Sequence, residues 1–116
     1  MAKLLLQNFN LHIQIIPKLK PVRVGLLLPL SGKHQQLGEN LMNAAVLAQF
    51  EVAKNIELFP YDTKGTAEGA LEAFKKAQDE NIEVILGPVL NVEVGAVASM
   101  ARSYDVPVIS FTSDKE

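Results

Sequence analysis

The chain has 116 residues, which suits one small domain, and its content of 48% hydrophobic and 21% charged residues is ordinary for a globular protein. The net charge of −2 does not indicate a nucleic-acid partner, and the lack of cysteine excludes disulfides, thiol catalysis and zinc–cysteine sites. No stretch approaches the roughly 20 apolar residues of a membrane span, and the first twenty residues contain no clear signal peptide.

Residues 1–20 differ in pattern from the rest of the chain. Pro17 and Pro21 bracket the sequence KLK, and the residues before them have the period of a strand. The apolar residues that alternate with polar ones there are Phe9, Leu11, Ile13 and Ile15. We interpret residues 1–20 as an N-terminal arm or linker and residues 21–116 as the domain.

The first half of the domain predicts two strands around one helix. VRVGLLL (22–28) is too uniformly apolar to have a wet face, so we expect a buried strand. Apolar residues at helical spacing then predict an amphipathic helix over 36–53. They are Leu41, Ala44, Ala45, Ala48 and Val52. IELFPYD (56–62) predicts a second strand, at an edge of the sheet because Pro60 has no N–H to donate.

The second half repeats the pattern of helix and strand. Thr66 is a suitable cap for a helix with an apolar stripe at Ala67, Ala70, Leu71, Phe74 and Ala77. EVILGPV (83–89) predicts a third strand, stopped by Gly87-Pro88. We expect Asn91 to cap a third helix, which carries Val94, Val97, Ala98 and Ala101. VPVISF (106–111) predicts the fourth strand.

The order β-α-β-α-β-α-β leaves room for one crossover helix between successive strands, and parallel strands need such crossovers. We therefore predict an α/β fold of the flavodoxin or Rossmann kind, with a parallel sheet in the order 2-1-3-4 and helices on both faces. The predicted core comprises Leu26, Leu28, Leu41, Ala45, Leu71, Phe74, Ile85, Val97 and Ile109.

Small and polar residues follow all four predicted strands, where ligands bind in such sheets. The segments are Ser31-Gly32, Asp62-Thr63, 87–91 and 110–114. Ser31 offers a hydroxyl, Gly32 permits a tight turn, and Asn91 offers an amide beside free N–H groups of a helix start. Such a helix start attracts a carboxylate or phosphate without a metal. Taken singly, each of these residues is also typical of an ordinary turn or cap.

Signals for an enzyme are weak. The patterns GxGxxG and GxxxxGK[ST] are absent, and the only histidines are His12 and His34. Asp62 lacks a histidine base with which to form a nucleophilic triad. We therefore predict a protein that is not an enzyme, with no cofactor, no catalytic residue and no metal site.

Several phrases resemble consecutive parts of the type I periplasmic-binding fold, the family of the leucine/isoleucine/valine-binding proteins of ABC transporters. They are "VRVGLLLPLSGKHQQLGENLMNAAVLA", "IELFPYDTKGTAEGALEAFKKA", "VILGPV" and "VPVISFTSD". "LLLPLSG", "DTKGTAEGA" and "LGPV" are most similar to a bacterial branch of penicillin-binding-protein activators, which stimulate peptidoglycan synthases. The resemblance covers about residues 21–116 and implies a partial N-terminal lobe of a two-lobed protein.

The resemblance also implies site residues. In the amino-acid binders, the loops after the third and fourth strands hold the charged groups of the ligand, which here correspond to Asn91 and to 112–114. The predicted ligand-binding residues are Ser31, Gly32, Asn91, Thr112 and Ser113. Two departures weaken amino-acid binding and favour the activator branch. Leu37 stands where an aromatic residue often covers the ligand, and "LNVEVG" replaces a run of serines.

Three functions remain open. The first is a solute-binding lobe, truncated, split or a fragment, whose partners are a small amino-acid-like ligand and a missing second lobe. The second is an interaction module without a small ligand that acts on a cell-wall synthase, and the third is a small flavodoxin-like enzyme or receiver domain. The resemblance implies a periplasmic location, whereas the lack of a clear signal peptide leaves the cytoplasm open.

Overall fold

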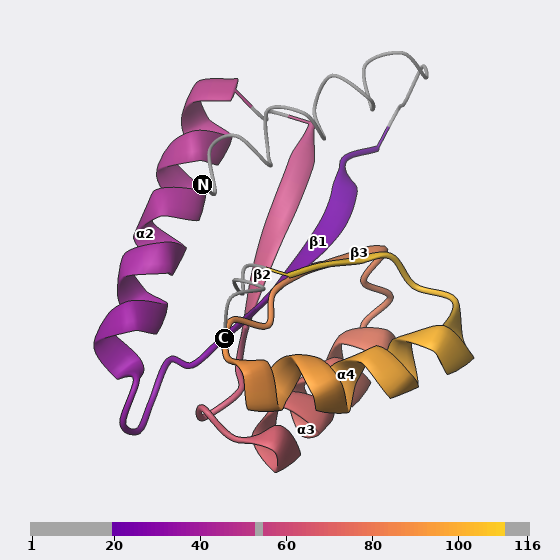
Figure 1. Ribbon diagram of the computed structural model, residues 1–116. Helices are drawn as coiled ribbons and strands as arrows, with labels where there is room; N and C mark the ends of the chain where they lie inside the picture. Colours follow the sequence, from indigo (N-terminus) through magenta and orange to yellow (C-terminus); the bar gives the residue numbers. More distant parts are fainter. Residues whose placement is uncertain (1–19, 53–54, 111–116) are drawn as a thin grey trace.

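The computed structural model describes residues 20–52 and 55–110, which form one parallel sheet with helices on its two faces (Figure 1). Strands and helices alternate along the chain, as predicted. The elements are β1 (Val22–Leu28), α2 (Gln35–Val52), β2 (Ile56–Asp62), α3 (Ala67–Asp79), β3 (Val84–Leu86), α4 (Asn91–Tyr104) and β4 (Val108–Ile109). None of the helices in the described ranges is long and apolar enough to span a membrane.

The strand order is β2-β1-β3-β4, which confirms the predicted order 2-1-3-4 and the edge position of β2. β1 pairs with β2 along its whole length, from Val22 opposite Ile56 to Leu28 opposite Asp62, and with β3 on its other side. All pairs are parallel, so the carboxyl ends of the strands point the same way. This end of the sheet carries the segments that contain Ser31, Gly32 and Asn91.

Two strands are shorter than predicted. The third was expected over 83–89, but β3 ends at Leu86 because Gly87 adopts a φ of 105° before Pro88. The fourth was expected over 106–111, but β4 covers only Val108–Ile109. Val106 instead donates its N–H to the Ala101 carbonyl at the end of α4, at 3.4 Å, and so belongs to the turn. Phe111 lies outside the described residues.

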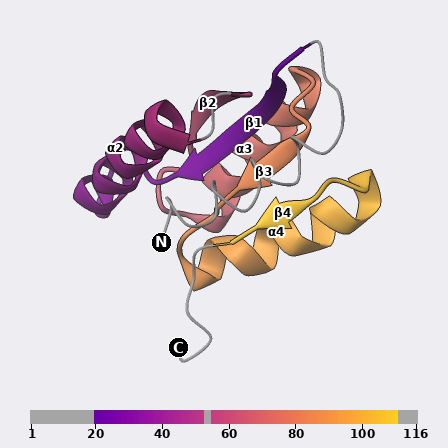
Figure 2. The same cartoon turned by 90° about the horizontal axis from the view of Figure 1, so that it is seen from above.

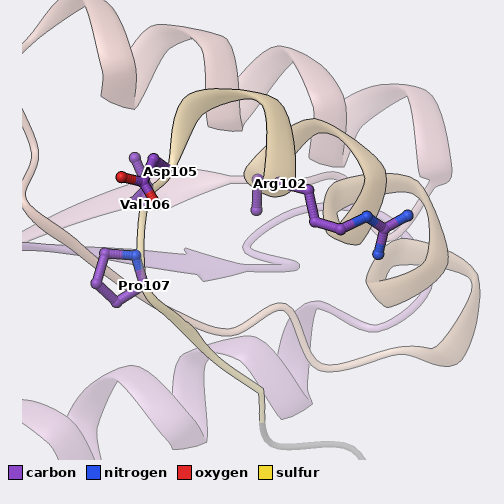
Figure 3. A pocket seen from close by; sticks show the side chains of 5 residues that line it. Arg102, Asp105, Val106 and Pro107 are labelled. Carbon is purple, nitrogen blue, oxygen red and sulfur yellow. The ribbon is translucent and has the colours of Figure 1, made fainter.

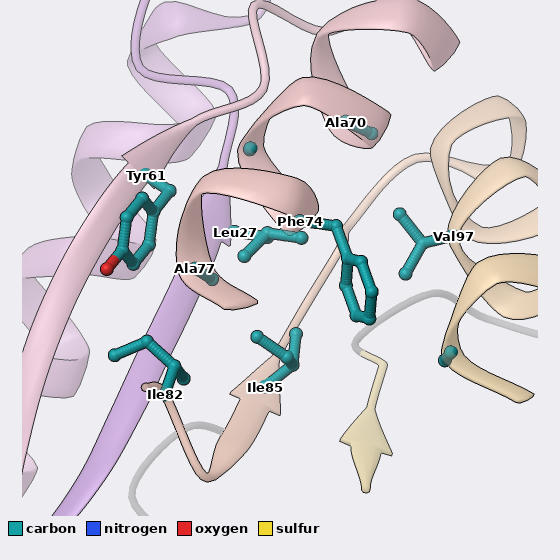
Figure 4. Close-up of a cluster of buried hydrophobic side chains, with 10 residues drawn as sticks. Leu27, Tyr61, Ala70, Phe74, Ala77, Ile82, Ile85 and Val97 are labelled. Atoms are coloured by element: carbon teal, nitrogen blue, oxygen red, sulfur yellow. The ribbon is translucent and has the colours of Figure 1, made fainter. Parts of the chain in front are cut away.

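The sheet separates two apolar layers. α2 covers one face, and α3 and α4 cover the other, as Figures 1 and 2 show. Alternate residues of β1 enter different layers because side chains alternate along a strand. Val24, Leu26 and Leu28 pack with α2, whereas Leu27 lies in the layer with Phe74 and the two helices of the other face (Figure 4).

The predicted core is largely confirmed. Six of the nine residues are buried, namely Leu26, Leu28, Ala45, Phe74, Ile85 and Val97. Leu41 and Ile109 are partly buried against the layer of α2. Leu71 is also only partly buried, and it lines a hollow on the outer side of α3 and α4.

One of the two predicted helix caps is confirmed. The Thr66 hydroxyl accepts a hydrogen bond from the Gly69 N–H at 2.9 Å, so Thr66 is the N-cap of α3. Asn91 as the N-cap of α4 is wrong, because Leu90 takes that position and Asn91 is the first helical residue. The Leu90 N–H instead donates to the side chain of Glu93, at 3.2 Å. The side chain that caps the start of α4 is therefore that of Glu93, the third helical residue, and not that of Asn91.

Candidate functional site

Loops from three strands meet at the carboxyl end of the sheet, around Gly65 in the loop between β2 and α3. A methyl group placed on Gly65 would lie 3.5 Å from His34 Cδ2, in the loop after β1, and 3.8 Å from Leu90 Cδ1, in the loop after β3. The end of β4 joins them, because the Ser110 hydroxyl donates to the Pro88 carbonyl at 3.2 Å. The predicted convergence of these segments is therefore present in the described residues.

Asp62, the last residue of β2, holds the loop after β1. Its Oδ1 accepts hydrogen bonds from the Leu30 N–H and the Lys64 N–H, both at 2.8 Å, and its Oδ2 accepts one from the Ser31 hydroxyl at 2.6 Å. Burial raises the pKa of the Asp62 carboxyl, but the hydrogen bonds from the Ser31 hydroxyl and from the N–H groups of Lys64, Leu30 and Ser31 outweigh it. The net pKa lies below its ordinary value, so the structure favours the carboxylate.

A buried polar pair joins the loops after β2 and β3. Thr63 and Glu93 are both fully buried, and the Thr63 hydroxyl donates to Glu93 Oε2. The Thr63 oxygen also accepts from the Gly65 N–H at 3.3 Å. Glu93 Oε1 accepts from the N–H groups of Leu90, at 3.2 Å, and Val89, at 3.4 Å. Both polar side chains are thus hydrogen-bonded, as burial requires.

Three of the five predicted ligand-binding residues lie on these loops. Ser31 is half-buried and uses its hydroxyl hydrogen for Asp62. Gly32 is exposed, with a φ of 83° that favours glycine, so its place in a tight turn is as predicted. Asn91 is exposed at the start of α4. Thr112 and Ser113 lie outside the described residues, and their role stays a prediction.

Sequence reasoning missed the contribution of Glu93 and the bracing role of Asp62. Asp62 and Thr63 stood among the converging segments, but nothing in their spacing showed which loops they would hold. The signal for Glu93 was its position as the third residue of a helix, where a Glu side chain reaches back to the N-cap N–H. That pattern predicts a cap, but it does not predict that the carboxylate is fully buried against Thr63.

The polar side chains of these loops include hydroxyls, the carboxylates of Asp62 and Glu93 and the imidazole of His34. Within the ranges 20–52 and 55–110, no group of three or more His, Asp or Glu residues is placed to hold a metal ion. A hollow of ≈ 540 Å³ lies at the other end of the sheet, before β4 (Figure 3). Its lining is Ala101, Arg102, Asp105, Val106 and Pro107.

Comparison with known proteins defines the family. The family model described as "Periplasmic binding protein" matches residues 21–116, which is most of the chain and all of the predicted domain. The chain belongs to the periplasmic binding protein family. Proteins of this family are typically not enzymes, and they usually act outside the cytoplasm.

Solved structures of periplasmic binding proteins share the fold. A leucine binding protein from Thermotoga maritima is 24% identical, with a TM-score of 0.74 over 80% of this chain and 28% of its own length. A branched-chain amino-acid transporter substrate-binding protein from Streptococcus pneumoniae, solved with isoleucine, is 22% identical, with a TM-score of 0.74 over 82% of this chain and 30% of its own. The chain therefore spans less than a third of these relatives.

A third structure bears on the predicted branch. Full-length LpoA from Haemophilus influenzae is 24% identical, with a TM-score of 0.64 over 81% of this chain and 17% of its own. It is one of several similar structures, so the comparisons define the family and leave the resemblance to the activator branch as a proposal. Among curated proteins, no sequence match was found.

Proposed function

We propose that this chain supplies one wall of the ligand site of a solute-binding protein that serves an ABC transporter outside the cytoplasm. The ligand is a small, amino-acid-like solute, and the opposing wall comes from a second lobe. The residues that contact the ligand are Ser31, Gly32, Asn91, Thr112 and Ser113. Family membership and the likeness to structures described as leucine-binding and isoleucine-bound support this ligand class.

The observation that carries the proposal is the bracing of the loops by two buried or half-buried carboxylates. Asp62 holds Leu30 and Ser31 in place, and Glu93 holds Val89 and Leu90, next to Asn91. Loops that are already ordered lose less conformational entropy when a ligand binds. Neither brace is needed to join neighbouring strands, which already pair through their backbones. The positions of Asp62 and Glu93 support the proposal that these loops are ordered before a ligand binds.

The test is a titration of the chain with leucine, isoleucine and valine, followed by nitrogen–proton correlation NMR up to about 10 mM, roughly ten times a limiting Kd of about 1 mM. We expect chemical shifts to change at the amides of Ser31, Gly32 and Asn91, and to stay constant at Glu57 and Asn81, near the amino ends of the strands. Asn91→Ala should reduce the changes, whereas Asn43→Ala, on the exposed surface of α2, should not. Shifts that are absent, or that spread evenly over the chain, would refute the proposal.

A second candidate function is an interaction module of the synthase-activator type that needs no small ligand. The observation in its favour is that Glu93 accepts the N–H groups of Val89 and Leu90, so a carboxylate of the chain already occupies these donors. A thermal-shift panel separates the two candidates, because a ligand that binds the folded state raises its stability by RT ln(1 + [L]/Kd). A melting temperature that no amino acid raises, combined with binding to a peptidoglycan synthase, would favour this candidate.

A further inference from the structure

The start of α4 already contains an internal anion. Glu93 is the third residue of this helix, and its side chain turns back to accept the N–H groups of Leu90 at 3.2 Å and Val89 at 3.4 Å. The side chain is fully buried, and the Thr63 hydroxyl donates to its other oxygen. The N–H group of the N-cap residue Leu90, which could otherwise attract an external carboxylate, is thus used by a carboxylate of the chain itself.

The charge of Glu93 also changes the field at this position. The N-terminal end of a helix carries a partial positive charge of roughly half a unit, and a carboxylate in the first turn offsets it. The lysines on the neighbouring loops, Lys33 and Lys64, are exposed, and Lys64 Nζ lies 4.0 Å from Glu72 Oε1, so water and salt screen them from the site. A ligand carboxylate at the start of α4 therefore meets a fixed negative charge and fewer free donors.

We propose that Glu93 is a specificity-determining residue of the site, which disfavours a ligand carboxylate at the start of α4 and favours a neutral group, such as an amide, in its place. This inference rests on the proposed solute-binding function. It differs from what the family resemblance implies, because in the amino-acid binders the corresponding loop holds a charged group of the ligand. The solute class is then amino-acid-like in shape but uncharged where it faces α4.

The first test compares leucine with leucinamide on the unaltered chain, by NMR titration at a slightly acidic pH at which both amines are protonated. The two ligands differ only in the carboxylate and the amide. We expect both to shift the amides of Ser31, Gly32 and Asn91, and leucinamide to bind about two- to fivefold more tightly, a ratio typical of charge effects at a helix end. Tighter binding of leucine would overturn the inference and leave the proposed function standing. Shifts with neither ligand would instead refute the proposed function.

The second test uses Glu93→Gln, which keeps the shape and an acceptor oxygen but removes the charge. We expect the ratio of the leucine Kd to the leucinamide Kd to fall by about two- to fivefold, so that the preference disappears or reverses. If the role of Glu93 were merely structural, Glu93→Gln would weaken the binding of both ligands equally and leave the ratio of their Kd values unchanged. This result would contradict the inference. Asp79→Asn, which removes a charge from the exposed end of α3, is the control and should not alter the ratio.

Discussion

The Ser31 hydroxyl donates a hydrogen bond to Asp62 Oδ2 at 2.6 Å, and this contact joins the loop after β1 to the end of the neighbouring strand β2. Asp62 is the last residue of β2 and lies opposite Leu28, the last residue of β1, in the parallel register. The chain beyond β1 then passes directly over the Asp62 carboxylate, which also accepts the Leu30 N–H. One side chain at a strand end therefore sets the shape of the next loop.

We expect Asp62→Asn to lower the free energy of unfolding at neutral pH by about 1–2 kcal/mol, because the amide replaces charge-assisted hydrogen bonds with weaker ones. The folded-state pKa of Asp62 lies below the unfolded value of about 3.9, so the carboxylate stabilises the fold above that pH and loses this effect as the pH falls through the folded pKa. Urea unfolding of both proteins from neutral pH to below about pH 4 should show the difference shrinking. The same change at exposed Asp79 is the control, and a difference that grows in acid would contradict the prediction.

Thr63→Val should lower the free energy of unfolding by about 1–3 kcal/mol, the range for leaving buried polar groups without a partner. The substitution keeps the shape of the side chain but removes the hydroxyl from Glu93, and it removes the acceptor of the Gly65 N–H. Thr63→Ser is the matched control, since it keeps the hydroxyl and loses one methyl group. Chemical denaturation measures both. If valine proves as stable as serine at this position, the buried pair does not stabilise the fold.

Gly38→Ala should destabilise the protein by about 1–3 kcal/mol through overpacking. A Cβ atom at Gly38 would lie 2.0 Å from the Pro29 carbonyl oxygen, so α2 or the loop after β1 has to move. Gly95 in α4 is the matched control, because a Cβ there meets nothing within 4 Å. Gly95→Ala should stabilise the protein by about 0.5–1 kcal/mol, the gain from helix propensity. Opposite signs of the two effects in thermal unfolding are the expected result.

The sequence predicts the strand order correctly because β1 and β2 contain residues that indicate their positions in the sheet. Pro60 lacks an N–H and marks an edge, and the uniformly apolar β1 requires neighbours and helices on all sides, which is where the structure places it. Strand ends that no Gly or Pro marks are harder to predict, as at Val106, which bonds to the Ala101 carbonyl of α4 and leaves β4 to start at Val108. A propensity for extended structure does not determine where tertiary contacts end a strand.

The candidate site was predictable only in outline. Parallel strands bring their carboxyl ends to one edge, so the meeting of the loops around Gly65 follows from the topology. The partners of individual polar side chains do not follow from it. Ser31 and Thr63 look alike in sequence, as hydroxyl residues just after strands, yet one bonds to half-buried Asp62 and the other to fully buried Glu93. The register and the helix starts decide these pairings.

Two phenylalanines differ in burial, and their replacement by alanine should therefore differ in its effect on stability. Phe74 is fully buried against α4, with its ring 5.8 Å from that of Tyr104, whereas Phe50 on α2 is 80% exposed. Phe74→Ala should cost roughly 3–5 kcal/mol through lost transfer energy and the cavity left behind. Phe50→Ala should change stability by no more than about 0.5 kcal/mol. A cost below about 1 kcal/mol for Phe74→Ala, measured by urea unfolding, would show that its layer is packed differently.

The affinity of the chain for amino acids should be low, with no Kd for leucine, isoleucine or valine below about 1 mM, or −4.1 kcal/mol. Small ligands bind tightly when walls on several sides bury most of their surface. The described residues provide loops at one edge of a single sheet, with Gly32 and Asn91 open to water. In water, each hydrogen bond contributes only about 0.5–1.5 kcal/mol net. A few such bonds do little more than offset the free-energy cost of immobilising the ligand. Isothermal titration calorimetry on the chain is the measurement. Micromolar binding of any of the three amino acids, abolished by Asn91→Ala, would show that one wall suffices and that Glu93 does not weaken the site.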